Sequence, residues 1–275
     1  MMGVPSETSP AKDGALLRTE NLGRRFGGLL ALEDLHLEVP AGGLYGLIGP
    51  NGAGKTTAFN LISGFLRPSN GCIRFAGEDI TGWPPHRVAA LWLARTFQNI
   101  RLFGELSVLD NVLVGCHCRG RASWLEAVLR LPRYRREEKT RLAQALELLR
   151  EVGLEDAAGK SAAELPYGHK RRLEIARALA TQPRFLLLDE PAAGLNPQET
   201  LELMQFLREV KERHGLTMLV IEHNLRLVMG LCQHLTVLDH GCTIAQGPPA
   251  AVQQHPEVIR AYLGVDERRQ GLAIT

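Results

Sequence analysis

Long apolar runs are absent from this chain of 275 residues. Its longest apolar candidates, Phe185–Leu188 and Leu216–Ile221, have the length of strands, whereas a helix that crosses a bilayer needs about 20 apolar residues. The sequence also lacks a charged start followed by an apolar core, which argues against a secretory signal. We therefore expect a soluble chain that works at a membrane only through a partner.

An excess of either charge is missing too. Lys and Arg number 32 against 30 Asp and Glu, which gives a formal net charge of +2, and no basic tract stands out. Proteins whose main role is on DNA or RNA carry a strongly basic face that meets the phosphate backbone. Nucleic acid is therefore not an expected partner.

Paired cysteines are not found either. The five cysteines are odd in number and never take the C-x-x-C spacing of a zinc site or a redox motif. The one cluster, Cys116-His117-Cys118, lacks the second pair of ligands that would close a tetrahedral metal site. We expect reduced thiols at all five positions: Cys72, Cys116, Cys118, Cys232 and Cys242.

What the chain does have is enough apolar content for a large core, at 45% hydrophobic residues. Residues 1–13 offer little to bury and are predicted to be a disordered leader. Residues 14–264 are predicted to form a single domain with a helical subdomain at about 98–180, followed by a tail at 265–275. The organisation is thus one large domain rather than two.

The most specific motif is Gly-Pro-Asn-Gly-Ala-Gly-Lys-Thr at Gly49–Thr56, which has every fixed position of the phosphate-binding loop G-x-x-x-x-G-K-[ST]. A short apolar run, Leu44–Ile48, precedes it as a predicted strand, and a predicted helix follows at Lys55–Ser63. These neighbours argue against a glycine-rich turn that matches by chance. The expected nucleotide-binding residues are Gly49, Pro50, Asn51, Gly52, Ala53, Gly54, Lys55, Thr56 and Thr57.

This loop predicts a bound nucleoside triphosphate, because glycines let successive backbone N–H groups turn inward around phosphates. Lys55 is expected to reach the β- and γ-phosphates, and the Thr56 hydroxyl to bind Mg²⁺. We refer to Gly49–Thr57 as the phosphate loop.

Two carboxylates follow a second apolar run, Leu186–Leu188, at the end of a predicted strand where ligands bind in open α/β sheets. Asp189 is suited to the Mg²⁺ shell, since a hard cation takes oxygen ligands. Glu190 is placed to polarise a water for in-line attack on the γ-phosphate. The alternative is a salt-bridged or capping acidic pair.

The remaining pattern is that of an α/β protein. Alternating polar and apolar residues at about 16–39 predict an antiparallel sheet with one wet face. Helical spacing dominates between Gln98 and Glu164, where Leu142, Leu146 and Leu149 suggest an apolar stripe. From about residue 185 onward, strands and helices alternate as in a parallel sheet.

Two local signals refine this pattern. Asn196, Pro197 and Glu199 are placed to cap a helix that Gly215 ends. The segment Arg130–Arg141 holds six basic residues, which either face lipid headgroups or a membrane partner or, as the favoured alternative, form a solvated helix face.

At Leu165–Ala178 the sequence resembles the signature segment of ATP-binding cassette proteins, and it stands just before Asp189 and Glu190 as that family requires. The resemblance extends from about residue 16 to the end. It implies an α/β P-loop NTPase fold with a mixed central sheet, an antiparallel β-subdomain and an inserted helical subdomain. It also implies ATP and Mg²⁺ as cofactors.

The resemblance assigns further residues one by one. Phe26 is similar to the aromatic residue that stacks on adenine, Gln98 to the glutamine that links Mg²⁺ and water to the transport partner, and His223 to the histidine that contacts the γ-phosphate. The loop at 193–196 resembles the one that crosses to the other subunit. Taken alone, Phe26 and His223 would be core residues and Gln98 a surface amide.

Two motifs depart from the family pattern, the signature segment and the crossing loop. The usual Leu-Ser-Gly-Gly-Gln has Pro166 for Ser, Tyr167 for the first Gly and His169 for Gln, so a hydroxyl and an N–H donor are lost at Pro166. A helix that begins near Gly168 can still face a phosphate with its free N–H groups, so we count Tyr167, Gly168 and His169 as nucleotide-facing. Asn196 replaces the usual Asp of the crossing loop.

Finer matches, including the tail at 258–264, resemble the larger ATPase subunit of branched-chain amino acid importers, so the expected cargo is branched-chain amino acids or related small polar solutes. The resemblance implies a second ATPase subunit, identical or different, integral membrane permease subunits, and indirectly a periplasmic or extracellular solute-binding protein. The expected location is peripheral, on the cytoplasmic face of the inner membrane. Alternatives are a lipopolysaccharide-export ATPase, a non-transport cassette in translation or DNA repair, and a P-loop kinase or switch GTPase.

Overall fold

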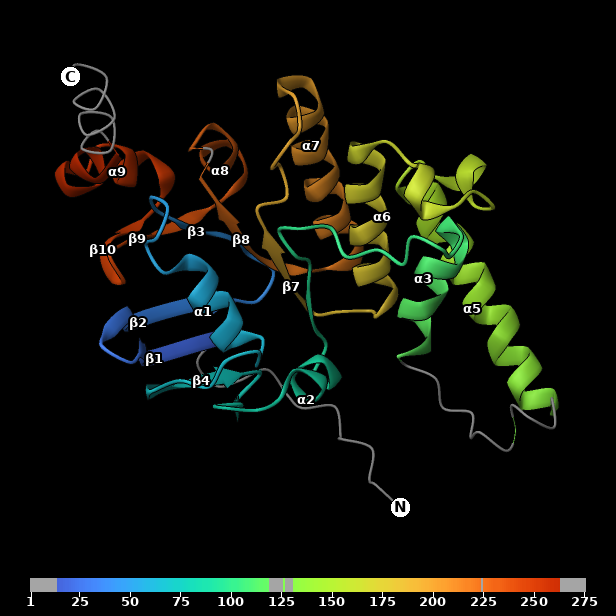
Figure 1. Cartoon of the computed structure of the whole chain (residues 1–275), viewed down its shortest axis with the longest axis horizontal. Coiled ribbons are helices and arrows are strands. Elements are labelled where there is room, and N and C mark those ends of the chain that lie inside the picture. The colour runs from blue at the N-terminus through green and yellow to red at the C-terminus, as the bar shows by residue number, and fades with distance from the viewer. Residues whose placement is uncertain (1–13, 119–125, 127–130, 224, 263–275) are drawn as a thin grey trace. The chain divides into compact units, whose positions relative to one another are not determined.

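The computed structural model describes residues 14–118, 126, 131–223 and 225–262. The predicted leader, the tail at 265–275 and Arg130 lie outside these residues. Residue contacts divide the chain into two compact units (Figure 1). Unit 1 comprises Met1–Leu91 with Arg208–Thr275, and unit 2 comprises Trp92–Leu207.

Unit 1 contains an antiparallel sheet with the strand order β2-β1-β4-β5. Along β2, Leu35, Leu37 and Val39 are buried whereas His36 and Glu38 are exposed, so the predicted sheet with one wet face is confirmed. The strands are β1 (Ala15–Phe26), β2 (Leu29–Pro40), β4 (Asn70–Phe75) and β5 (Glu78–Asp79).

Unit 1 also contains four strands in the order β10-β9-β3-β8, in which β3 runs parallel to β8 and β9. Ile48 is in register with Glu222, so the carboxyl ends of β3 and β8 lie side by side. The strands are β3 (Leu44–Ile48), β8 (Thr217–Glu222), β9 (His234–Asp239) and β10 (Cys242–Gly247); the helices are α1 (Lys55–Ile62), α2 (Pro85–Ala90), α8 (Leu225–Leu231) and α9 (Pro249–Gln253).

Unit 2 pairs two parallel strands, β6 and β7, and packs α3 against both α5 and α6 (Figure 1). A further helix, α7 (Pro197–His214), contains the boundary between the units. The elements are β6 (Leu93–Arg95), α3 (Val108–His117), α5 (Pro132–Glu151), the 3-10 turns η1 (Glu155–Ala157) and η2 (Ala162–Glu164), α6 (Tyr167–Ala180) and β7 (Phe185–Asp189).

The predicted apolar stripe of α5 is wrong in part. Leu149 is fully buried, but Leu142 and Leu146 are 41% and 38% exposed. The helix instead buries the neighbouring positions Arg141 and Ala145. Small Ala145 lets adjacent helices approach closely, and the stem of Arg141 is apolar enough to cover core surface while its head finds polar partners. Leucine spacing alone could not identify that face.

The predicted helix ends are confirmed. The Asn196 backbone N–H donates to Glu199 Oε2 at 2.9 Å, and the Glu199 N–H donates to Asn196 Oδ1 at 2.9 Å. This reciprocal capping box starts α7 at Pro197. Gly153 and Gly215 follow α5 and α7 with φ of 70° and 59°, a conformation that favours glycine after a helix.

All five cysteines are free thiols. Across the part of the chain that the structure describes, no helix combines the length and the apolar character that a membrane crossing requires. The same residues contain no group of three or more His, Cys, Asp or Glu side chains arranged to hold a metal ion.

Candidate active site

The phosphate loop lies between a buried strand and a helix, as the motif requires. It leaves β3 after Ile48, and α1 begins at Lys55 with Gly54 as its N-cap. Lys55 is only 5% exposed, and its Nζ donates to the carbonyl oxygens of Gly49 at 2.7 Å and Pro50 at 2.8 Å. The first backbone N–H groups of α1 have no intrahelical acceptors, so loop and helix start present donors and a positive charge together.

Two of the glycines are required by close packing. At Gly49, with φ of 148°, an added Cβ would lie 2.0 Å from the Leu238 carbonyl oxygen. At Gly54, with φ of 99°, it would lie 2.6 Å from the carbonyl oxygen of Ala31. Neighbouring backbone therefore holds the loop in shape at two points, so its conformation is set before any ligand arrives.

The remaining loop residues differ in exposure. Asn51, Gly52 and Thr56 are exposed, whereas Ala53 is buried. The Thr56 residue stands in the first turn of α1. Exposure of Thr56 leaves its hydroxyl accessible to a ligand outside the protein.

His223 and the phosphate loop share one edge of unit 1. His223 directly follows Glu222, which is in register with Ile48, the last residue before the loop. The His223 side chain is exposed. Phe26 lies elsewhere in unit 1, at the end of β1; its ring is 41% exposed, with the guanidinium of Arg24 over it at 4.7 Å from the centroid.

Sequence reasoning missed one contact of the loop. Burial raises the pKa of Tyr262 to about 12, and an interaction with the backbone of Gly49, the first residue of the loop, opposes this rise, although the hydroxyl makes no hydrogen bond of normal geometry to another described residue. The hydroxyl itself is buried. The only sequence signal was the resemblance of the segment around Tyr262 to a subfamily, which says nothing of where the side chain lies.

In unit 2, Asp189 is salt-bridged. Its Oδ2 accepts a hydrogen bond from Arg95 Nη2 at 2.9 Å, and the two side chains are 4% and 6% exposed. Burial lowers the pKa of Arg95, and Asp189 opposes this shift. The salt-bridged alternative therefore holds for Asp189, and a role in binding Mg²⁺ has to use the other carboxylate oxygen.

Glu190 is held by the glutamine that the sequence singled out. Gln98 Nε2 donates to Glu190 Oε2 at 3.0 Å, and both residues follow the parallel strands β6 and β7. Glu190 has φ of 45°, a left-handed conformation that is costly for a residue other than glycine. Such strain concentrates at functional sites, where the surrounding structure enforces it.

The altered signature segment starts a helix one residue earlier than expected. Pro166 is the N-cap and makes no side-chain capping bond, and α6 begins at Tyr167. Tyr167 is 45% exposed and His169 is also exposed, while Gly168 is half-buried. The Tyr167 ring packs close to Gly194, where φ is 79° and an added Cβ would lie 3.1 Å from the ring.

The donors of each unit suit a part of a nucleotide with Mg²⁺. In unit 1, Lys55 and the start of α1 supply positive charge and N–H donors, which match phosphate oxygens, and Thr56 supplies a hydroxyl. In unit 2, Gln98 and Asp189 supply amide and carboxylate oxygens, and oxygen atoms are the ligands that this hard cation prefers. Because Mg²⁺ keeps several waters, it needs no dense cluster of acidic side chains.

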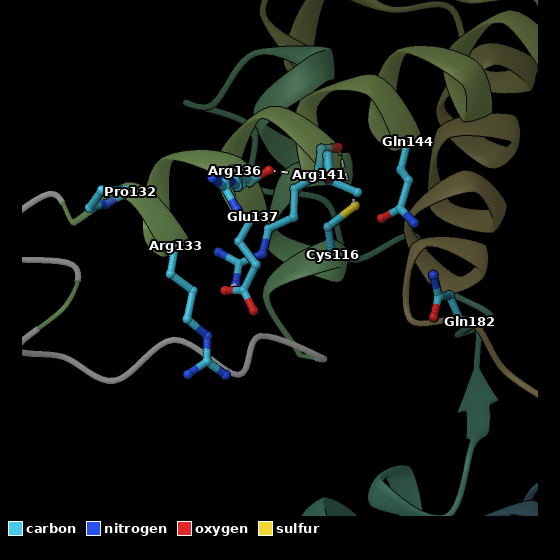
Figure 2. Close-up of a pocket in the computed structure, with 9 residues that line it drawn as sticks. Cys116, Pro132, Arg133, Arg136, Glu137, Arg141, Gln144 and Gln182 are labelled. Atoms are coloured by element: carbon cyan, nitrogen blue, oxygen red, sulfur yellow. Dashed lines mark hydrogen bonds and ion pairs between the residues drawn. The ribbon is translucent and has the colours of Figure 1, made fainter.

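The basic segment forms part of a polar cavity of about 480 Å³ in unit 2 (Figure 2). Arg141 Nη2 donates to Glu137 at 2.7 Å, and Arg133 lies 3.5 Å from Glu126. Arg133 and Arg136 are exposed. These ion pairs neutralise part of the positive charge, as on an ordinary solvated helix face. We assign the cavity no ligand.

With this geometry established, comparison with known proteins defines the class. The family model described as ABC transporter matches residues 32–193, and the chain belongs to this family. The fold is that of an ATP-binding cassette, and the chain is therefore a nucleotide-binding ATPase of this family. A second model, described as Branched-chain amino acid ATP-binding cassette transporter, matches residues 242–268.

Individual relatives narrow the class. The chain is 45% identical, over 90% of its length and 98% of the relative's, to the high-affinity branched-chain amino acid transport ATP-binding protein BraF of Pseudomonas aeruginosa. It is 36% identical, over 90% and 97%, to the lipopolysaccharide export system ATP-binding protein LptB of Acidithiobacillus ferridurans. A crystal structure of MJ1267, an ATP-binding cassette of an ABC transporter in its ADP conformation, matches with a TM-score of 0.79 and 35% identity, covering 91% of this chain and 99% of that one.

These comparisons confirm the predicted family and fold class. They rank the lipopolysaccharide-export alternative below the branched-chain amino acid one. The kinase and GTPase alternatives are wrong, since neither belongs to the matched family.

Proposed function

We propose that this chain is the ATP-hydrolysing subunit of an importer that takes up branched-chain amino acids through partner membrane subunits. One observation carries the choice of substrate: similarity to BraF covers 90% of the chain, and the branched-chain amino acid model matches residues 242–268. The same proposal includes Mg²⁺ as a cofactor, permease partners, a second ATPase subunit, a solute-binding protein that acts indirectly, and a peripheral place at the cytoplasmic face of the membrane.

In this proposal the phosphate loop binds the nucleotide, Asp189 contributes to Mg²⁺ binding, and Glu190 is the catalytic base. Lys55 and the N–H groups at the start of α1 bind the β- and γ-phosphates, and the Phe26 ring stacks on the base. Thr56, Gln98 and Asp189 would hold Mg²⁺, which supplies neutralisation of phosphate charge. Tyr167, Gly168 and His169 would face the nucleotide held by the second subunit.

Hydrolysis is assigned to Glu190, assisted by Gln98 and His223. Glu190 polarises a water and accepts its proton as the water attacks the γ-phosphorus; the bond from that phosphorus to the β–γ bridging oxygen breaks, and ADP and phosphate are the products. The Gln98 amide fixes the orientation of the carboxylate through the 3.0 Å hydrogen bond. His223 contacts the γ-phosphate. Since a positioned general base contributes about 10²–10⁴-fold to a rate, most of the turnover depends on Glu190.

A transport assay tests this function. The chain is assembled in proteoliposomes with candidate permease, second ATPase and solute-binding subunits from the same organism, and labelled leucine uptake is measured with internal ATP. We expect uptake with the wild-type chain and none with Glu190→Gln. An assembly that hydrolyses ATP but moves no branched-chain amino acid would reject the substrate. Co-purification with lipopolysaccharide-transport components would favour the export alternative.

A further inference from the structure

A buried ion pair lies on α6, one helical turn after the signature residues. Arg171 and Glu174 are 1% and 2% exposed, and Arg171 Nη1 donates to Glu174 Oε2 at 2.8 Å. Burial raises the pKa of Glu174, and the charge of Arg171 opposes this rise. Because the cost of desolvating two charges commonly offsets their attraction, such a pair is weak evidence of a role in stability.

The pair binds the backbone of the segment that carries Gln98. Arg171 Nη1 also donates to the carbonyl oxygen of Phe97 at 2.8 Å, and Nη2 donates to that of Gln98 at 3.0 Å. Glu174 Oε1 accepts a hydrogen bond from the Phe97 N–H at 3.2 Å. Two consecutive residues are thus gripped by one guanidinium and one carboxylate, which leaves little freedom for the backbone at Gln98.

The Gln98 side chain continues this chain of contacts to Glu190, which accepts its 3.0 Å hydrogen bond. At the other end, Arg171 Nη2 lies 3.4 Å from the Tyr167 hydroxyl, in the signature segment. All these residues belong to unit 2. A continuous path of polar contacts therefore leads from the start of α6 to the proposed catalytic base.

A simpler explanation is that the pair only fastens α6 within unit 2. Its hydrogen bonds favour a more specific role, because they reach the backbone of Phe97 and Gln98 and the hydroxyl of Tyr167, and Glu174 also interacts with the backbone of Arg101 in the same segment. The neighbouring arginine of α6, Arg172, is different: its ion pair with Glu202 of α7 is more exposed, at 31% and 50%, and involves no backbone group of the 97–98 segment.

We propose that Arg171 and Glu174 are a positioning pair that fixes Gln98 and, through its amide, orients the carboxylate of Glu190 for hydrolysis. The inference rests on the proposed ATPase function. It predicts that loss of the pair lowers turnover but leaves nucleotide affinity unchanged, because neither side chain belongs to the phosphate loop.

Two variants of the full chain test the pair. Arg171→Lys keeps the charge but cannot span two carbonyl groups with one planar fork. Arg171→Met with Glu174→Leu removes both charges at similar volume, a change that folded proteins commonly tolerate. For each we expect kcat for ATP to fall about 10- to 100-fold, with the ATP Kd within about twofold of wild type. Cooperative thermal unfolding verifies that each variant folds.

The control is Arg172→Met, which removes the neighbouring half-buried arginine of α6 and should leave kcat unchanged. The path is tested by combining the Arg171→Met/Glu174→Leu change with Gln98→Ala. If the pair acts through Gln98, the combined variant has the same kcat as Gln98→Ala alone, since contacts in one path are not additive.

Unchanged kcat in a folded pair variant would overturn the inference, as would a further independent loss in the Gln98→Ala background. A fall in ATP affinity equal to the fall in kcat would reduce the pair to a structural role. The proposed function fails separately: that outcome requires a wild-type chain without ATP hydrolysis, or full hydrolysis by Glu190→Gln.

Discussion

The two units hold their functional residues in different ways. In unit 1 the phosphate loop is shaped by its own glycines, by neighbouring backbone, and by the bonds of Lys55 to Gly49 and Pro50 within the same motif. In unit 2 the carboxylates are held by side chains more than ninety positions away: Arg95 binds Asp189, and Gln98 binds Glu190. A local motif supports binding, whereas long-range side-chain contacts support catalysis.

This difference indicates which substitutions should impair each unit. The phosphate loop cannot keep its backbone conformation when a side chain is added at Gly49 or Gly54, because neighbouring backbone leaves no space for a Cβ atom. Asp189 becomes costly when Arg95 is removed, because a buried charge then loses its compensation, and Glu190 loses its orientation when Gln98 is removed.

The largest effect should come from unit 2. Arg95→Met removes the partner of a carboxylate that is 4% exposed, and we expect the free energy of unfolding to fall by about 3–5 kcal/mol. Urea denaturation measures this change. Arg101→Met is the control, because both arginines lie over the Phe97 ring but Arg101 is exposed. Equal losses in the two variants would show that the Asp189 pair is not the important contact.

In unit 1, Lys55→Ala should weaken ATP binding rather than the fold. The ammonium makes charge-assisted bonds to phosphates, so we expect the Kd for ATP to rise about 10- to 100-fold. Isothermal titration calorimetry checks this, with Lys139→Ala on the exposed face of α5 as the control. An unchanged affinity would argue against the assignment of the loop.

Gly54 and Gly52 allow the effect of a positive φ on stability to be separated from the effect of steric crowding. Both Gly54 and Gly52 have positive φ, of 99° and 85°, but only Gly54 would place a Cβ against backbone; at Gly52 nothing lies within 4 Å. We expect Gly54→Ala to cost about 1–3 kcal/mol of unfolding free energy and Gly52→Ala about 1 kcal/mol. Chemical denaturation compares them, and the reverse order would mean that packing against Ala31 does not shape the loop.

The smallest effect concerns Tyr262, whose hydroxyl is buried. The pKa of Tyr262 is raised from 10.0 to about 12 in the folded protein, so folding favours the neutral phenol. Its contribution to stability is fully present below pH 10 and is lost as the pH rises through 12, with a loss of about 1 kcal/mol at pH 11. Denaturation of wild type and Tyr262→Phe at pH 8 and pH 11 measures the difference; equal pH dependence would remove Tyr262 from this role.

The features that the sequence predicted most directly depend on residues close together in the chain. Gly49–Thr57 needs only its own spacing and flanking elements, and the capping box of α7 likewise lies within four residues. Asp189, Glu190 and Gln98 were also predicted as site residues, but the sequence did not indicate that Arg95 binds Asp189 or that Gln98 binds Glu190. Arg95 reaches Asp189 only in the folded chain, and the same holds for the contact of the Arg171–Glu174 pair with the 97–98 segment. No short-range sequence pattern therefore marks these partners.

The prediction of the buried face of α5 was wrong in part for a related reason. Three leucines at helical spacing predicted one stripe, but the helix buries Arg141 and Ala145 and exposes Leu142 and Leu146. Which face is covered depends on the shape of α3 and α6, against which α5 packs. Hydrophobic spacing reports that a helix forms but does not determine its rotation when polar stems can be buried.

The central claim is that Glu190 acts as the base while other residues bind the nucleotide. A single-turnover experiment with excess protein and labelled ATP tests it most directly, because it separates bound from hydrolysed nucleotide. We predict that wild type converts its bound ATP to ADP, whereas Glu190→Gln binds ATP with the same affinity and cleaves it about 10²–10⁴-fold more slowly. Hydrolysis at the wild-type rate by Glu190→Gln would contradict the claim.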